Sequence, residues 1–149
     1  MDCEPTDILL VEDEPAHAEL TKRAIRKAGN AHQIHIVSDG EEAFDYLYNR
    51  GQYEDKVKYP MPGLILLDIK LPGMDGVEVL KKIKEDPLLK RIPVIMLTTS
   101  EREEDVLRSY EQYANSYLTK PVGFKEFEEK IMQIDFYWMI LNKPPILKE

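Results

Sequence analysis

Short apolar runs recur along the chain, and each is followed by a stretch with the periodicity of a helix. The runs cover residues 8–11, 34–37, 64–67, 94–97 and, more weakly, 117–118. The first, third and fourth runs are apolar at every position, which is typical of strands buried on both faces of a parallel sheet. The second run alternates because it contains His35, so we place that strand at an edge of the sheet.

Helix signals fill the intervals between the runs. Residues typical of helix N-termini stand at 39–42, 75–78 and 100–103, each ahead of apolar positions with helical spacing. The helix after the first of these should bury one face, made of Ala43, Phe44, Leu47 and Tyr48. Two further helices are predicted at about 15–29 and 123–141, and the polar segment 51–62 is predicted to be a surface loop.

Five strand-and-helix units in succession predict a doubly wound α/β fold, in which helices cover both faces of a parallel sheet. No repeat, low-complexity segment or linker divides the sequence. We therefore predict one domain over residues 1–149, with its core at about 6–141 and a short tail at 142–149.

Composition and charge narrow the range of partners. The net charge is −8, which argues against nucleic acid, because neutralising phosphates supplies much of the affinity of proteins that bind it. The N-terminus lacks the basic and apolar regions of a signal peptide. No apolar stretch approaches the roughly 20 residues that a membrane span requires. We expect a cytoplasmic protein that binds neither nucleic acid nor membrane.

Polar residues of related chemistry stand at the ends of four predicted strands. Glu12 and Asp13 follow the first strand, Asp68 the third, Thr98 the fourth and Lys120 the fifth. In such sheets ligands bind at the carboxyl ends of the strands, so these side chains should face one site. Crowded carboxylates repel one another unless a cation joins them, and oxygen ligands of this kind suit Mg²⁺. Lys120 offers a point charge, and Thr98 a hydroxyl, to a phosphate.

Each of these residues, taken alone, has an ordinary structural explanation. An acidic pair before a helix is more often a cap than a metal site, and an aspartate before a turn is most often a turn residue. The same holds for a threonine at a strand end or a lysine on the surface. What favours a functional site is the joint pattern, in which each residue stands at the end of the correct strand in the correct order.

Four motifs resemble the response-regulator receiver family: ILLVEDE at 8–14, LLDIKLPGMDG at 66–76, VIMLT at 94–98 and YLTKP at 117–121. The resemblance covers about residues 6–141 and implies a flavodoxin-like sandwich with strand order 2-1-3-4-5. The segment LTTS at 97–100, the loop at 51–62 and the aromatic residues at 136–138 are similar to small receivers that partner bacterial phytochrome kinases.

The resemblance also implies chemical roles. Asp68 would be the nucleophile that takes a phosphoryl group from the phosphohistidine of a sensor histidine kinase. Asp13 and Asp68 would bind Mg²⁺, with Glu12 acting through water and Lys70 through its backbone carbonyl. Such transfer demands little of the protein beyond positioning and charge neutralisation.

The remaining implied roles concern signalling. Lys120 would pair with the phosphoryl group, and Thr98 and Tyr117 would form the switch pair that responds to it. The chain would then signal by phosphorylation-dependent binding of a partner. It would not act as an enzyme on a separate substrate, and would catalyse only its own phosphoryl transfer and dephosphorylation.

Consecutive aromatic residues near the C-terminus predict an interface. Phe136, Tyr137 and Trp138 occupy successive helical positions, so they cannot all face one core. Tyr110 and Tyr113 of the preceding predicted helix could join them, which predicts a homodimer. The alternative is that the tail folds back and covers these rings within a monomer.

Two other functions compete with phosphoryl acceptance. One is a pseudo-receiver of the same fold that never phosphorylates, against which the complete set of site residues counts. The other is a flavin-binding electron carrier, against which the acidic segment Glu12-Asp13-Glu14 counts, because it would repel a phosphate. We assign no role to His17, His32 or His35, which are not at metal-ligand spacings.

Overall fold

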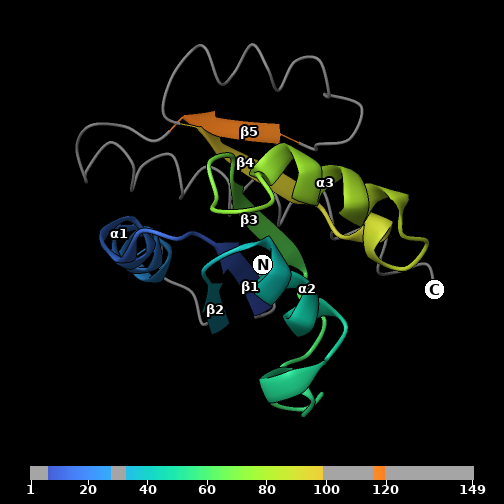
Figure 1. The fold of residues 1–149 in the computed structure, drawn as a ribbon. Helices are drawn as coiled ribbons and strands as arrows, with labels where there is room; N and C mark the ends of the chain where they lie inside the picture. Colours follow the sequence, from blue (N-terminus) through green and yellow to red (C-terminus); the bar gives the residue numbers. More distant parts are fainter. Residues whose placement is uncertain (1–6, 28–32, 99–115, 120–149) are drawn as a thin grey trace, which may run out of the picture.

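A computed structural model describes residues 7–27, 33–98 and 116–119 of the chain (Figure 1). Its sheet has five parallel strands in the order β2-β1-β3-β4-β5, as the sequence predicts, with β2 at an edge. The strands are β1 Asp7–Val11, β2 Gln33–Val37, β3 Leu64–Asp68, β4 Val94–Thr98 and β5 Ser116–Thr119. The helices are α1 Pro15–Lys27, α2 Gly40–Leu47 and α3 Gly76–Glu85, with short 3₁₀ turns η1 Gly51–Tyr53 and η2 Leu89–Arg91.

Helices cover both faces of the sheet, and consecutive residues of the central strands turn to opposite faces (Figure 1). Leu9 and Leu67 pack in the cluster that includes α2 and α3, whereas Leu10 and Leu66 pack in the cluster that includes α1. All four are essentially fully buried. This two-sided burial explains why the central runs are apolar at every position.

Aspartate side chains begin two of the helices, as predicted. The Asp39 carboxylate accepts a hydrogen bond of 2.8 Å from the Glu42 amide, and the Asp75 carboxylate one of 2.9 Å from the Glu78 amide. The Glu42 carboxylate accepts from the Ser38 amide at 2.8 Å, one residue before the position that a reciprocal capping box uses. The cap therefore also holds the end of the preceding strand.

Two details of the prediction for this region are wrong. Tyr48 does not join the buried face of α2, because the helix ends at Leu47 and the Tyr48 side chain is 44% exposed. The segment 51–62 is not wholly at the surface, because Tyr53 and Pro62 are buried, whereas residues 54–58 form a continuous exposed stretch. The helix predicted at 15–29 is described as Pro15–Lys27, and residues 28–32 lie outside the described range.

The base of this loop is held by side chains. Asn49 has a positive φ of 53°, which asparagine tolerates better than most residues. Its Nδ2 donates to the carbonyl oxygens of Tyr53 and Tyr59, both at 2.9 Å. The Tyr46 hydroxyl donates to the Pro60 carbonyl oxygen at 2.9 Å. The loop is thus an ordered structure built on an aromatic cluster.

Several predicted features fall outside the described residues. They include both C-terminal helices, Lys120 and the aromatic residues proposed for an interface, namely Tyr110, Tyr113, Phe136, Tyr137 and Trp138. Within the described ranges, none of the helices combines the length and the apolar character needed to cross a membrane.

Candidate functional site

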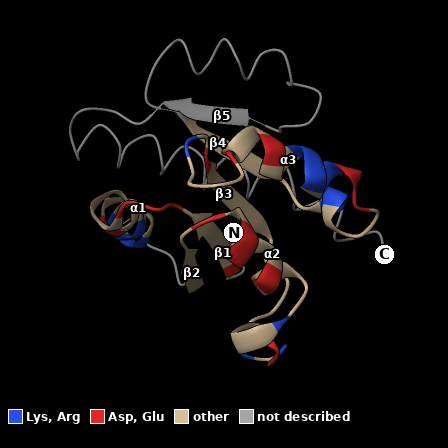
Figure 2. Cartoon of the chain, in the orientation of Figure 1, with Lys and Arg blue, Asp and Glu red and all other residues tan. Residues whose placement is uncertain are grey.

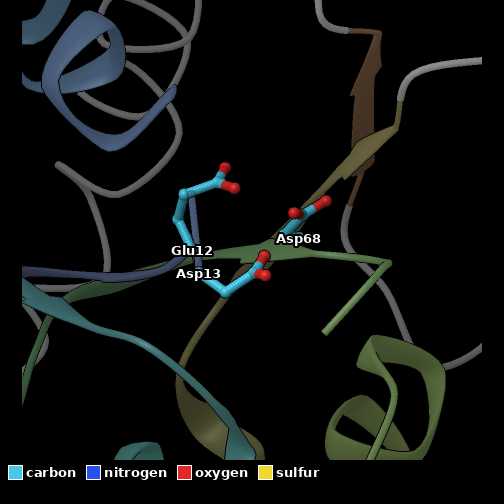
Figure 3. Close-up of side chains that lie close together, drawn as sticks. All are labelled: Glu12, Asp13 and Asp68. Atoms are coloured by element: carbon cyan, nitrogen blue, oxygen red, sulfur yellow. The ribbon is translucent and has the colours of Figure 1, made fainter. Parts of the chain in front are cut away.

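Three carboxylates meet where β1 and β3 end. The strands are neighbours with Val11 opposite Leu67, so the residues that follow Val11 lie beside Asp68, the last residue of β3. One carboxylate oxygen each from Glu12, Asp13 and Asp68 lies within 4.8 Å of the other two (Figure 3). The sequence predicts this grouping correctly, because the carboxyl ends of parallel strands share one edge.

Burial makes this cluster unusual. The exposed fraction is 2% for Glu12 and 5% for Asp68, whereas Asp13 is exposed. The Glu14 amide lies 3.4 Å from Glu12 Oε2, and the Lys70 amide lies 3.4 Å from Asp68 Oδ1. Hydrogen bonds of that length are weak, and like charges that lie close together in a place of low dielectric repel one another.

The donor set fits a hard divalent cation. All three groups are carboxylates, and neither a histidine nor a cysteine joins them in the described part of the chain. Mg²⁺ prefers oxygen ligands and usually binds one or two carboxylates while it keeps several waters. The pocket is open to solvent on the side of Asp13, where those waters would enter. The residues present therefore suit the ion that the sequence predicts.

His17 stands at the rim of this pocket, which the sequence analysis did not foresee. Its Nδ1 lies 3.8 Å from Glu12 Oε2, and its Nε2 lies 3.6 Å from Glu14 Oε1. The available signal was the spacing of three residues between Glu14, just before α1, and His17 in its first turn.

Gly76 packs against the backbone of Asp68, and its importance was also not predicted from the sequence. Its amide donates to the Ile69 carbonyl oxygen at 2.9 Å. A Cβ at this position would lie 2.2 Å from the Asp68 carbonyl oxygen and 2.6 Å from the Ile69 Cα. Because both neighbours are backbone atoms, only glycine lets α3 begin so close to the end of β3.

The other predicted residues can be placed by strand register alone. Thr98 is the last residue of β4 and lies one position beyond Leu97, which is paired with Asp68. Tyr117 lies in β5 opposite Met96, two residues before Thr119. Thr98 therefore belongs to the same edge of the sheet as Asp68, and Tyr117 lies further back along its strand. Lys120 lies outside the described residues.

A model of the response regulator receiver domain matches residues 8–132. The chain belongs to the response regulator receiver family. Receiver domains bind Mg²⁺ in an acidic pocket and accept a phosphoryl group, and both statements hold for this receiver. Family membership also implies a histidine kinase as partner, and it sets aside the flavin-carrier alternative.

Similar proteins cover nearly the whole length of the receiver. Response regulator Rcp1 of Synechocystis is 44% identical over 135 residues, which is 91% of this chain and 90% of Rcp1. The probable methanogenesis regulatory protein FilR2 of Methanothrix harundinacea is 40% identical over 142 residues, covering 95% and 89% of the two chains.

Solved structures agree in fold. The Mn²⁺-bound form of Rcp1 has a TM-score of 0.78 at 44% identity, covering 91% of this chain and 95% of Rcp1. The phosphorylated cyanobacterial phytochrome response regulator RcpA has a TM-score of 0.80 at 40% identity, covering 91% and 94%. The receiver thus resembles one protein crystallised with a divalent metal and another crystallised with a phosphoryl group.

Proposed function

We propose that Asp68 is the phosphoryl acceptor of this receiver and that Glu12, Asp13 and Asp68 hold its Mg²⁺, with the Lys70 carbonyl as a further ligand. One observation carries the proposal: Asp68 is the last residue of the central strand, nearly buried, and within 4.8 Å of the two other carboxylates. An isolated buried aspartate would bring no cation to a phosphoryl donor, whereas this cluster would.

In the reaction, an Asp68 carboxylate oxygen attacks the phosphorus of the kinase phosphohistidine. An O–P bond forms, the P–N bond breaks, and the electron pair leaves with the imidazole nitrogen. Bound Mg²⁺ supplies positive charge against the phosphoryl oxygens and the crowded carboxylates. Lys120 and the Thr98 hydroxyl hold the remaining phosphoryl oxygens. The receiver promotes only this transfer and the later hydrolysis of its own acyl phosphate, and it has no separate substrate.

The signal would leave the site through Thr98 and Tyr117. Thr98 ends β4 at the edge that holds Asp68, so a hydroxyl drawn toward the phosphoryl group would pull on β4. Tyr117 belongs to the neighbouring strand β5 and is paired with Met96 of β4. A movement of β4 would thus reach the aromatic ring, which is a two-state element biased by local charge.

For partners, we propose a phytochrome-type histidine kinase and a second copy of the chain, in the cytoplasm, with residues 1–149 acting as one receiver domain. Support for the kinase type comes from the 40% identity with the phytochrome response regulator RcpA. Support for the homodimer comes from the consecutive aromatic residues Phe136, Tyr137 and Trp138, which Tyr110 and Tyr113 could join.

The assignment of Asp68 is tested with acetyl phosphate, a small donor that requires no kinase. Asp68→Asn should lose labelling in Mg²⁺ to background, because the amide is nearly isosteric but lacks the nucleophilic charge. Asp45→Asn is the matched control, since Asp45 is half-exposed on α2, where it forms a 3.3 Å ion pair with Arg50. Intact-mass spectrometry reads the adduct. Labelling of Asp68→Asn at the wild-type rate would refute the assignment, and an unlabelled wild type would favour the pseudo-receiver.

The partners need separate experiments. A phosphotransfer profile that includes a phytochrome histidine kinase should show the fastest transfer from that kinase. Light scattering should give the mass of a dimer for the wild type and of a monomer for Tyr137→Ala/Trp138→Ala. A wild-type mass near 17.4 kDa, whether phosphorylated or not, would contradict the dimer and favour the alternative in which the tail covers the aromatic rings within a monomer.

A further inference from the structure

A hollow of about 360 Å³ lies at the carboxyl edge of the sheet, separate from the three carboxylates of the phosphoryl site. Its lining comes from two connections: Asp39 and Glu41 at the start of α2, and Pro72, Gly73 and Met74 between β3 and α3. Asp39 lies two residues beyond Val37, and Pro72 four residues beyond Asp68, so both connections leave the edge where the phosphoryl site lies.

The shape of the hollow is fixed by packing around Gly40. The missing Cβ of Gly40 would lie 2.7 Å from Val79 Cγ2 and 3.5 Å from Met74 Cε, so α2 begins in close contact with α3. Met74 packs against the main core cluster, and Gly73 has a φ of 73°, which sets the turn of the β3–α3 connection. The apolar part of the hollow therefore rests on ordered neighbours.

The charge at the hollow favours a cation. Asp39 and Glu41 contribute two full negative charges, and no ion pair is found for either within the described residues. The N-terminus of α2 contributes a positive potential worth only about half a charge, and it also acts on the nearby acidic side chains. The acidic side chains therefore outweigh the helix end. The connection after β1 and the first turn of α2 are acidic, whereas several basic residues gather on α3 (Figure 2).

We propose that this hollow receives a lysine or arginine side chain of the kinase that donates the phosphoryl group. This docking role rests on the proposed function of Asp68. The aliphatic stem of such a side chain would lie on Met74 and Pro72, while its charged head meets Glu41. Long basic side chains combine an apolar stem with a charged end, which matches an apolar floor with an acidic rim. Glu41 would then be a docking residue that contributes to choice of kinase.

Docking can be tested separately from the chemistry of Asp68, because acetyl phosphate donates its phosphoryl group without any docked kinase. Glu41→Gln should raise the KM for transfer from the kinase chosen by the phosphotransfer profile about 3- to 10-fold with little change in kcat, since rim charges act mainly on association. Glu41→Arg should raise it further, and both effects should shrink in high salt. Labelling by acetyl phosphate should stay at the wild-type rate or rise slightly, because that donor is an anion.

Glu78 provides the matched control. It lies in the first turn of α3 as Glu41 lies in the first turn of α2, it is exposed, and it does not line the hollow. Glu78→Gln and Glu78→Arg should leave the KM for the kinase unchanged. If the Glu41 and Glu78 variants shift it equally, the effect is one of net charge and the docking proposal is wrong. If Glu41→Arg transfers normally, the hollow is not a docking site. Loss of acetyl phosphate labelling in the wild type would instead overturn the function of Asp68.

Discussion

The two ends of the sheet differ in the chemistry of the polar groups that gather there. At the carboxyl end, Glu12 and Asp68 are nearly buried beside Asp13, so charges of one sign share a small volume. At the amino end, where the loop leads into β3, Asn49 and the Tyr46 hydroxyl donate hydrogen bonds of 2.9 Å to backbone carbonyls. The first end offers clustered carboxylates to a cation, whereas the second holds its loop with its own hydrogen bonds.

This difference indicates where stability and function are located. A buried polar group that is hydrogen-bonded adds order, whereas clustered like charges cost free energy until a cation arrives. We therefore expect substitutions at the carboxyl end to change phosphorylation and the response to Mg²⁺. Substitutions at the amino end should change stability and leave phosphorylation alone. The following variants test that division, starting with the largest effect.

Gly76→Ala should have the largest effect, because the new methyl group would meet backbone atoms of Asp68 and Ile69 that cannot move aside cheaply. We expect it to lower the free energy of unfolding by about 2–4 kcal/mol and to slow labelling by acetyl phosphate. The control is Gly73→Ala, where φ is 73° but no atom lies within 4 Å of the added Cβ. That variant should cost only about 1 kcal/mol. Urea unfolding measures both, and equal costs would contradict the role assigned to Gly76.

Removing one carboxylate should raise the stability without metal and weaken the stabilisation by Mg²⁺. Wild-type protein should gain about 1–2 kcal/mol at a Mg²⁺ concentration ten to thirty times its Kd. Asp13→Asn should be more stable than wild type without metal and should gain less from Mg²⁺, because the repulsion is relieved. Thermal melts with and without Mg²⁺ measure this, with Asp45→Asn as the control for lost charge. A wild-type melting temperature indifferent to millimolar Mg²⁺ would contradict the acidic metal pocket.

The carboxyl end could be predicted from sequence to a greater extent than the amino end. Strand ends are marked by the change from an apolar run to a polar residue, which is local information, and parallel topology then brings Glu12, Asp13 and Asp68 together. The caps at Asp39 and Asp75 were predicted from similarly local signals, whereas the strand order was implied by the resemblance to the receiver family.

What could not be predicted depends on three-dimensional contacts and helix ends that no periodic pattern in the sequence marks. Nothing near Tyr53 indicates that its ring is buried, since the burial comes from Tyr46 and Tyr59, with ring centroids 5.4 and 4.9 Å away. The need for glycine at position 76 comes from the backbone of Asp68 and Ile69, eight and seven residues earlier. Tyr48 fits the helical pattern of α2, but the helix ends one residue too soon.

Substitutions of Asn49 test the amino end. Asn49→Ala removes two hydrogen bonds and leaves in the left-handed region a residue that tolerates it less well than asparagine, which should cost about 2–3 kcal/mol. Asn49→Gly removes the same bonds but tolerates the φ of 53°, so it should cost about 1 kcal/mol less than alanine. Acetyl phosphate labelling and the stabilisation by Mg²⁺ should match wild type in both variants. A loss of either would show that the two ends of the sheet are coupled.

The smallest effect concerns a polar pair at the surface between α2 and α3. The Tyr48 hydroxyl donates to the Asp86 carboxylate, and the amides of Leu88 and Leu89 donate to the same side chain at 2.8 and 3.1 Å. These bonds, the one from Tyr48 first, hold the pKa of Asp86 below its ordinary value of 3.8. Asp86 lies at the surface and is only partly buried, so solvent screening keeps the contribution to stability small.

The sign of this effect follows from the direction of the shift. Because the pKa of Asp86 is lower in the folded chain, its contribution is present above the ordinary value of 3.8 and is lost as the pH falls through the folded pKa. Tyr48→Phe should move the pKa of Asp86 back toward 3.8, but only partly, since the two amides still donate to it. Carbon NMR of the Asp86 carboxyl group measures the shift directly. Tyr46→Phe is the control, because its hydroxyl donates to a backbone carbonyl and should leave Asp86 unchanged. An unaltered Asp86 titration in Tyr48→Phe would mean that this hydrogen bond does not persist in solution, and that only the backbone amides set the pKa.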